Sequence, residues 1–213
     1  MNFDYLIDHW QRVLELARDH LELSLGAVAI ALVMAIPIGV LAARYRRLTL
    51  PVLSVLGAIY TVPTLALLAF LIPSLGIGRR PALIVLALYA QIFLVRNIVA
   101  GLRGVNPGTL EAARGIGMTP WQVFRQVHWP LALPVMLAGL RTAVVTTISL
   151  ATVAAWVDAG GLGTLLFQGL ARLYPSETLA GAIAIVALAL LSDAVLRLAE
   201  RGTAISRARR AVG

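Results

Sequence analysis

The side chains that most often carry catalysis or hold metals are scarce in this chain. Among its 213 residues there is no cysteine, which excludes disulfides, thiolate metal sites and a cysteine nucleophile. The three histidines, His9, His20 and His128, lack a metal-ligand spacing such as HExxH, and no motif supports a Ser–His–Asp triad. Every basic residue is arginine, and a Walker A loop needs a lysine to hold ATP phosphates. We therefore expect no catalytic residue and no metal site.

Two charged residues inside apolar segments are the remaining candidates for polar chemistry. Arg141 is expected to extend toward a nearby membrane interface or to donate to carbonyls of neighbouring helices. Asp193 is expected to pair with Arg197 one helical turn away. The alternative is a polar lock that Arg141 and Asp193 share between two helices.

The composition indicates the elements that must position these residues. The chain is 60% hydrophobic and 13% charged, with a mean hydropathy of +0.87. A soluble domain carries about 25% charged residues, so this balance is typical of a membrane protein.

Long uncharged stretches predict an all-α protein with about five membrane-spanning helices. The stretch 23–43 alone is long enough to cross about 30 Å of hydrocarbon as a helix. Pro63 is expected to kink the second span. The predicted spans are 23–43, 50–72, 81–102, 133–157 and 178–198, within one membrane domain of residues 21–200.

Residues 1–20 predict an amphipathic helix lying on the membrane surface, because apolar and charged positions alternate at helical spacing. The segment begins with acidic residues and is not a signal peptide. Its apolar positions are Phe3, Leu6, Ile7, Trp10, Val13, Leu14 and Ala17. Residues 201–213 form a basic tail at the other terminus.

The arginines predict the orientation, because cytoplasmic segments of membrane proteins are enriched in basic residues. With five spans and the N-terminus outside, the inner segments hold Arg44, Arg46, Arg47, Arg96, Arg103, Arg114, Arg125, Arg197, Arg201, Arg207, Arg209 and Arg210. The outer segments hold only Arg12, Arg18, Arg79, Arg80 and Arg172. We expect the segment 103–130 and the basic tail in the cytoplasm. The net charge of +8 then reflects topology, and no nucleic-acid partner is expected.

One mixed segment, EAARGIGMTPWQVFRQVHWP (111–130), separates two of these spans. Asn106 or Thr109 is expected to cap a first helix, and Thr119 a second that starts at Pro120 and runs to about residue 127. Gly115 and Gly117 break the first helix or let another backbone approach. Pro130 and Pro134 are then expected to interrupt the chain before the next span begins. Such a segment is either a docking element or an ordinary ordered loop.

The spacing within this segment resembles the EAA loop of permease subunits from binding-protein-dependent ABC importers. The matching positions are Glu111, Ala112, Ala113, Gly117, Val127 and Pro130. The family more often has Ile at the position of Val127 and Leu at that of Trp129, and both replacements keep an apolar group. The resemblance implies the fold of methionine-importer-type permeases. It also implies a second permease subunit, two ATPase subunits that use ATP and Mg²⁺, and an external substrate-binding protein. This chain itself would bind no cofactor.

Within that resemblance, a short helix of the loop contacts the ATPase. The residues implied for this coupling are Glu111, Ala112, Ala113, Gly117, Met118, Thr119, Pro120, Val123, Phe124, Val127 and Pro130.

Three further stretches are similar to the osmoprotectant branch, which imports glycine betaine, carnitine and choline: YTVPTLALLAFLIPSLGIG, LALPVMLAGLRTA and ATVAAWVDAGGLGTLLFQGL. Asp158 departs from the small residue common there, and methionine and phosphonate importers share the AGGLG element. A quaternary ammonium is held by aromatic faces, so Tyr60, Tyr89 and Trp156 are candidates for its path. Helix packing or an interfacial belt is the alternative role of these rings.

The glycines Gly160, Gly161 and Gly163 permit a tight turn on the outer side. We expect residues 158–173 to form a re-entrant or lid-like element at an outer gate, with plain loop packing as the alternative. A secondary transporter is the rival class, but the chain shows no clear internal repeat.

Overall fold

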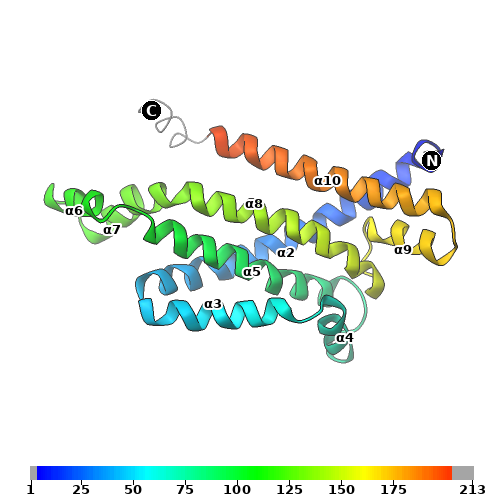
Figure 1. Cartoon of the computed structure of the whole chain (residues 1–213), viewed down its shortest axis with the longest axis horizontal. Coiled ribbons are helices and arrows are strands. Elements are labelled where there is room, and N and C mark those ends of the chain that lie inside the picture. Colours follow the sequence, from blue (N-terminus) through cyan, green and yellow to red (C-terminus); the bar gives the residue numbers. More distant parts are fainter. Residues whose placement is uncertain (1–3, 203–213) are drawn as a thin grey trace.

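The computed structural model describes residues 4–202, and every regular element in this range is helical (Figure 1). Phe3 and the part of the predicted basic tail from residue 203 onward lie outside the described residues. The elements are α1 (Asp4–Asp8), α2 (Trp10–Arg44), α3 (Arg46–Thr61), α4 (Thr64–Leu75), α5 (Arg79–Arg103), α6 (Pro107–Gly115), α7 (Pro120–Gln122), the π-helix η1 (Val123–His128), α8 (Trp129–Ala154), the 3₁₀-helix η2 (Ala155–Val157), α9 (Gly163–Ala171) and α10 (Pro175–Gly202).

The helices α2, α5 and α8 pack together as the centre of the bundle, with α3 beside α5 and α10 beside α8 (Figure 1). Small residues allow this close approach, which is how helices associate within membranes. On α2, Ala27, Ala31 and Ala35 are fully buried. A Cβ at Gly39 would come within 2.6 Å of Ile98 on α5. The small residues of α2 share this core with larger buried side chains such as Leu86 and Leu94 of α5.

Four of the helices are long and apolar enough to cross a membrane: α2, α5, the continuous helix from Pro120 to Val157, and α10. The pair α3 and α4 makes a fifth candidate span, bent by 90°. The all-α fold with four to five spans confirms the predicted class.

The second predicted span differs from a kinked helix. The chain breaks completely at Val62 and Pro63, because the residue before a proline is driven out of the helical region. Val62 is extended, with φ −67° and ψ 131°. Its carbonyl accepts a hydrogen bond from the Tyr89 hydroxyl on α5, so the freed backbone group stays paired. The 90° bend is therefore held from outside the helix.

From Asp4 onward, the N-terminal segment does not form one helix that ends near residue 20. Only α1 is separate, and α2 runs without interruption from Trp10 into the first span. Tyr5 and Val13 are buried against α9 and α10, whereas Ile7 and Trp10 are exposed. The predicted apolar stripe is thus divided between a protein contact and an outer surface.

Contrary to the prediction, Pro130 and Pro134 do not interrupt the helix. The helix that starts at Pro120 continues through η1 into α8. Within η1 the backbone N–H of Trp129 bonds the carbonyl of Phe124, five residues back. This wider turn carries the helix past Pro130, which has no N–H to donate.

Candidate functional site

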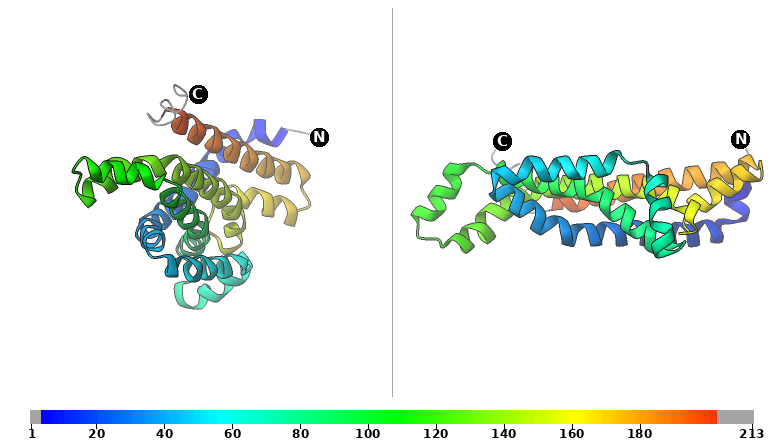
Figure 2. Two further views of the ribbon diagram at one scale, coloured as in Figure 1. Left: turned by 60° about the vertical axis from the view of Figure 1, so that its left-hand side comes forward. Right: turned by 90° about the horizontal axis from the view of Figure 1, so that it is seen from below.

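The segment between α5 and α8 projects beyond one end of the bundle (Figure 2). We call this end, with α6, α7 and η1, the loop end. The side chain of Asn106 accepts a hydrogen bond from the Gly108 amide at 2.8 Å and caps α6. Thr119 and Gln122 form a reciprocal capping box at α7, with bonds of 3.3 and 2.8 Å. Both predicted helices therefore start at local caps.

Gly117 ends α6 through a Schellman motif. The amide of Met118 bonds the carbonyl of Ala113, and the amide of Gly117 bonds that of Arg114. Gly117 has a φ of +90°, which glycine adopts without steric cost. A Cβ at this position would meet nothing within 4 Å. Gly117 is therefore needed for its backbone conformation. The alternative role, in which a glycine lets another backbone approach, does not apply at this position.

The residues predicted for coupling differ in exposure. Ala113 and Val123 are buried, and Met118, Phe124, Val127 and Pro130 are half-buried. Glu111, Ala112, Gly117, Thr119 and Pro120 are exposed. Two exposed apolar side chains were not predicted: Ile116 is 81% exposed and Trp121 66%. The signal for them was present, since both are large apolar residues within an otherwise polar stretch.

The predicted aromatic residues separate into two places. The ring of Tyr60 lies edge-on to the rings of Tyr89 and Phe93, with centroids 5.6 Å and 5.3 Å away. Tyr89 is buried, and Tyr60 is partly exposed. Trp156 instead packs against Phe167, at the far end of α8. The structure brings together Tyr60, Tyr89 and the unpredicted Phe93, and leaves Trp156 outside this cluster.

At the opposite end, the turn from 158 to 163 is packed into the protein. We call it the glycine end. Gly160 and Gly161 have φ values of +82° and +81°. A Cβ at Gly161 would lie 2.8 Å from Nδ1 of His20. A Cβ at Gly163 would overlap the carbonyl of Thr152 and lie 2.9 Å from Cβ of Ala155.

His20 ties this turn to two helices and was not predicted as a functional residue. Its ring is fully buried. Nδ1 accepts a hydrogen bond from the Leu162 amide at 3.2 Å, and Nε2 donates to the carbonyl of Ile148 at 2.8 Å. An acceptor at Nδ1 and a donor at Nε2 define the neutral imidazole with its proton on Nε2. The contacts span more than a hundred residues of sequence, so no local pattern could reveal them.

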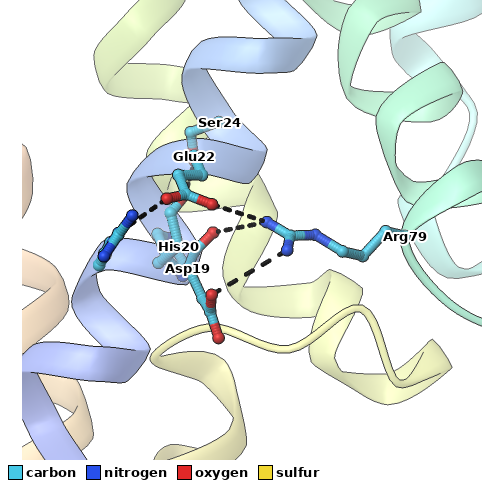
Figure 3. A network of polar contacts seen from close by, with 6 residues as sticks. Asp19, His20, Glu22, Ser24 and Arg79 are labelled. Carbon is cyan, nitrogen blue, oxygen red and sulfur yellow. Dashed lines mark hydrogen bonds and ion pairs between the residues drawn. The ribbon is translucent and has the colours of Figure 1, made fainter.

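Next to His20, charged residues join α2 to the start of α5. Figure 3 shows Arg79 of α5 directed at Asp19 and Glu22 of α2. The Arg79 guanidinium donates to the backbone carbonyl of Asp19 at 3.3 Å. It also lies 4.0 Å from the Asp19 carboxylate and 3.9 Å from the Glu22 carboxylate. Arg18 also contacts Glu22 at 2.9 Å. Arg79, Asp19 and Glu22 are about half exposed and Arg18 is 82% exposed, so the network orients the helix ends more than it stabilises them.

A buried carboxylate, Glu177, lies at the first turn of α10 and was also not predicted. It accepts a hydrogen bond from the Tyr5 hydroxyl at 3.2 Å and lies 3.7 Å from the Arg172 guanidinium. Burial, with the Glu177 carboxylate beside it, raises the pKa of Tyr5. This contact holds α1 against α10.

The two charged residues inside apolar segments meet between spans. Nε of Arg141 lies 3.2 Å from Oδ1 of Asp193, and its Nη1 lies 3.3 Å from Glu200. Asp193 also pairs with Arg197 at 2.7 Å, as the spacing predicted. The expected pair with Arg197 and the alternative lock with Arg141 therefore both form, and the result is a network joining α8 to α10.

Residues 35–205 match the family described as the binding-protein-dependent transport system inner membrane component. This match covers most of the chain, including the capped helix pair and the glycine turn. The chain belongs to this family. It is a membrane-spanning permease, and permeases of this family are non-catalytic subunits of ABC importers.

Curated relatives at about 40% identity are osmoprotectant permeases. The choline transport system permease protein OpuBB of Bacillus subtilis is 41% identical over 183 residues, which cover 86% of this chain and 84% of the relative. The osmoprotectant import permease protein OsmW of Salmonella typhimurium is 40% identical over 197 residues, covering 90% and 92%.

Solved structures show the same fold at lower identity. An amino acid ABC transporter with histidines has a TM-score of 0.78 at 22% identity, over 95% of this permease and 99% of that chain. The inward-facing MetNI methionine ABC transporter has a TM-score of 0.69 at 23% identity, over 87% and 95%. These likenesses confirm the predicted fold of methionine-importer-type permeases.

Proposed function

We propose that this permease imports quaternary-amine osmoprotectants, namely glycine betaine, choline and carnitine, in an ATP-driven importer. The observation that carries the proposal is the group of relatives at about 40% identity, whose names specify these compounds. A partner ATPase hydrolyses ATP with Mg²⁺, and an external protein delivers the substrate. Two permease subunits, identical or similar, form the path on two ATPase subunits.

The loop end supports the proposed coupling to the ATPase. Its two helices are fixed by local caps, and they project Ile116 and Trp121 into an exposed position. Exposed apolar side chains on a rigid element are typical of a protein contact. Because the helix of α7 continues through η1 into α8, a displacement of α7 is transmitted to a central span. Alternating access would follow from such movement.

The cluster of Tyr60, Tyr89 and Phe93 supports a path for a methylated cation. Aromatic faces attract a quaternary ammonium by about 0.5–2 kcal/mol each. A weak attraction suits a path, because strong binding would slow release. Tyr89 is buried, whereas Tyr60 is partly exposed and Phe93 half-buried, so Tyr60 and Phe93 offer the more accessible faces. Trp156 contributes to this role only if the path extends to the glycine end.

A transport assay tests the substrate. The permease is expressed with an ATPase and a binding protein from the same genome, and uptake of labelled betaine, choline, carnitine and methionine is compared. We expect uptake of quaternary amines that depends on ATP and persists when ion gradients are collapsed. Uptake of methionine alone would overturn the substrate class. Dependence on an ion gradient would indicate a secondary transporter.

The orientation, with the N-terminus outside and the loop end in the cytoplasm, is tested with single cysteines, since the chain has none. Leu173, 88% exposed near the glycine end, and Ile116 at the loop end are replaced by cysteine. An impermeant reagent added to intact cells should label Leu173→Cys, and should label Ile116→Cys only after permeabilisation. The reverse pattern would overturn the orientation.

A further inference from the structure

A basic cavity of about 470 Å³ lies where the loop end meets the bundle. Arg44 at the end of α2, Arg103 at the end of α5, Arg114 of α6 and His128 of η1 line it, and the lining includes no acidic side chain. The uncharged part of α2 ends just before Arg44. The cavity therefore lies at the level where the helices leave the hydrocarbon, which is the level of lipid headgroups.

The basic groups of the cavity are only partly engaged within the protein. Arg103 donates from Nε and Nη2 to the carbonyls of Ala43 and Ala42, and Nη2 also bonds Thr49. Its Nη1 has no partner among the residues that the structure describes. Arg44 lies over the ring of Tyr45, and Arg114 forms no ion pair with any residue of the described range. Positive charge is thus directed into a space that no carboxylate of the described chain neutralises.

An apolar groove continues from this cavity along α2. The two hollows share Val40 and Phe124 in their walls. Beyond these residues the groove is lined by Ile36 and Pro37 of α2 and by Trp121 and Trp129, and Arg125 is the one charged residue in its wall. Tryptophan is enriched at the membrane interface. The groove runs from the arginines of the cavity toward the uncharged part of α2.

We propose that this composite site binds one anionic phospholipid, with its phosphate in the basic cavity and an acyl chain in the groove. Basic pockets between transmembrane helices are suited to acidic headgroups, and each arginine near the surface strengthens the attraction. A free anion would satisfy the cavity but not the groove, and an apolar peptide would satisfy the groove but not the cavity. The bound lipid joins the ends of α2 and α5 to α6 and η1. The inference rests on the membrane location of the family and not on the proposed substrate.

Fluorescence quenching tests the site in the full chain. Trp10→Phe and Trp156→Phe leave Trp121 and Trp129 as the emitting residues of the four tryptophans. The protein is placed in phosphatidylcholine vesicles, and brominated phosphatidylglycerol or brominated phosphatidylcholine is titrated. We expect stronger quenching by phosphatidylglycerol at equal mole fraction. Equal quenching by the two lipids would overturn the proposal.

Charge variants separate the cavity from general surface charge. Arg44→Gln and Arg114→Gln should each lower the preference for phosphatidylglycerol about fivefold. Both side chains are exposed, so the fold should tolerate either change. The matched control is Arg46→Gln with Arg47→Gln, which removes two arginines at the same end that do not line the cavity. An equal loss in the control would show a diffuse effect and contradict the site.

Two competitors distinguish other occupants. Inorganic phosphate at millimolar concentration should leave the preference for phosphatidylglycerol unchanged, because it cannot fill the groove. If phosphate abolishes the preference, the site is one for soluble anions and the proposal is wrong. If ATPase subunits that support transport displace the brominated lipid, Trp121 and the groove belong to the ATPase contact proposed for the loop end, and the lipid site is wrong.

Discussion

The two ends of the permease use glycine for different physical reasons. At the loop end, Gly117 adopts a φ of +90° and is surrounded by open space. At the glycine end, Gly161 combines a positive φ with direct contact to His20, and Gly163 allows two backbones to touch. The loop end needs a residue that tolerates a positive φ. The glycine end needs a residue without a side chain, because neighbouring atoms fill the space, so it behaves as part of the core.

The largest effect is expected for Gly163→Ala. Its Cβ would overlap the carbonyl of Thr152, which belongs to the backbone of α8 and cannot rotate away. Overpacking a core costs about 1–3 kcal/mol and more where the backbone must shift. We expect a loss near the upper end of this range, measured as a lower thermal unfolding temperature in detergent.

Gly57→Ala is the matched control for that substitution. Gly57 lies within α3, and a Cβ there meets nothing within 4 Å. Removing a helical glycine should leave stability unchanged or raise it by up to about 1 kcal/mol. If the two variants unfold at the same temperature, the glycine end is not a packed element.

His20→Leu should have the next largest effect. The leucine fills a similar volume but leaves the Leu162 amide and the Ile148 carbonyl without their partner. Each unpaired buried group costs about 1–3 kcal/mol, and we expect about 2–3 kcal/mol in total. Thermal unfolding measures the loss, and His20→Gln should restore part of it because an amide can both donate and accept. A leucine variant as stable as the parent would show that the two hydrogen bonds of His20 do not contribute to stability.

The same contrast explains what the sequence could predict. The caps at Asn106 and Thr119 are bonds between residues two or three apart, so local pattern was sufficient. The position of the break at Pro63 was also local, but its 90° angle depends on Tyr89 of another helix. The burial of Tyr5 and Val13 depends on partners in α9 and α10, which are distant in the sequence. At the candidate site, the sequence predicted the two capped helices of the loop but not which side chains face outward.

At the loop end, Gly117→Ala should affect coupling more than stability. The left-handed conformation costs a residue with a Cβ about 1–2 kcal/mol. The Schellman bonds of Met118 and Gly117 would weaken, and the angle between α6 and α7 would change. We expect ATP hydrolysis to continue while substrate uptake falls, measured together in proteoliposomes of the assembled transporter.

Substitutions of different size at Gly117 distinguish a requirement for its backbone conformation from a requirement for free space. Because a Cβ at Gly117 meets nothing, Gly117→Trp should uncouple the transporter about as much as Gly117→Ala, while the subunit still inserts. Gly117→Asn should retain more uptake, since asparagine tolerates positive φ. Normal uptake by the tryptophan variant would refute the role of this residue.

The smallest effect is expected between the two ends, where Arg141 and Asp193 join α8 to α10. Their side chains are only 29% and 23% exposed, so the pair is less screened than a surface bridge. The Asp193–Arg197 pair lies on one helix, and such i,i+4 pairs contribute about 0.3–0.5 kcal/mol. A double-mutant cycle of Arg141→Gln and Asp193→Asn should give a coupling of about 1 kcal/mol in thermal unfolding, larger than the cycle with Arg197→Gln. The coupling should also persist at high salt, whereas that of Arg197 should decline. If the Arg197 cycle gives the larger value, α10 is held to α8 by apolar packing, and the network serves only to neutralise Asp193 within the membrane.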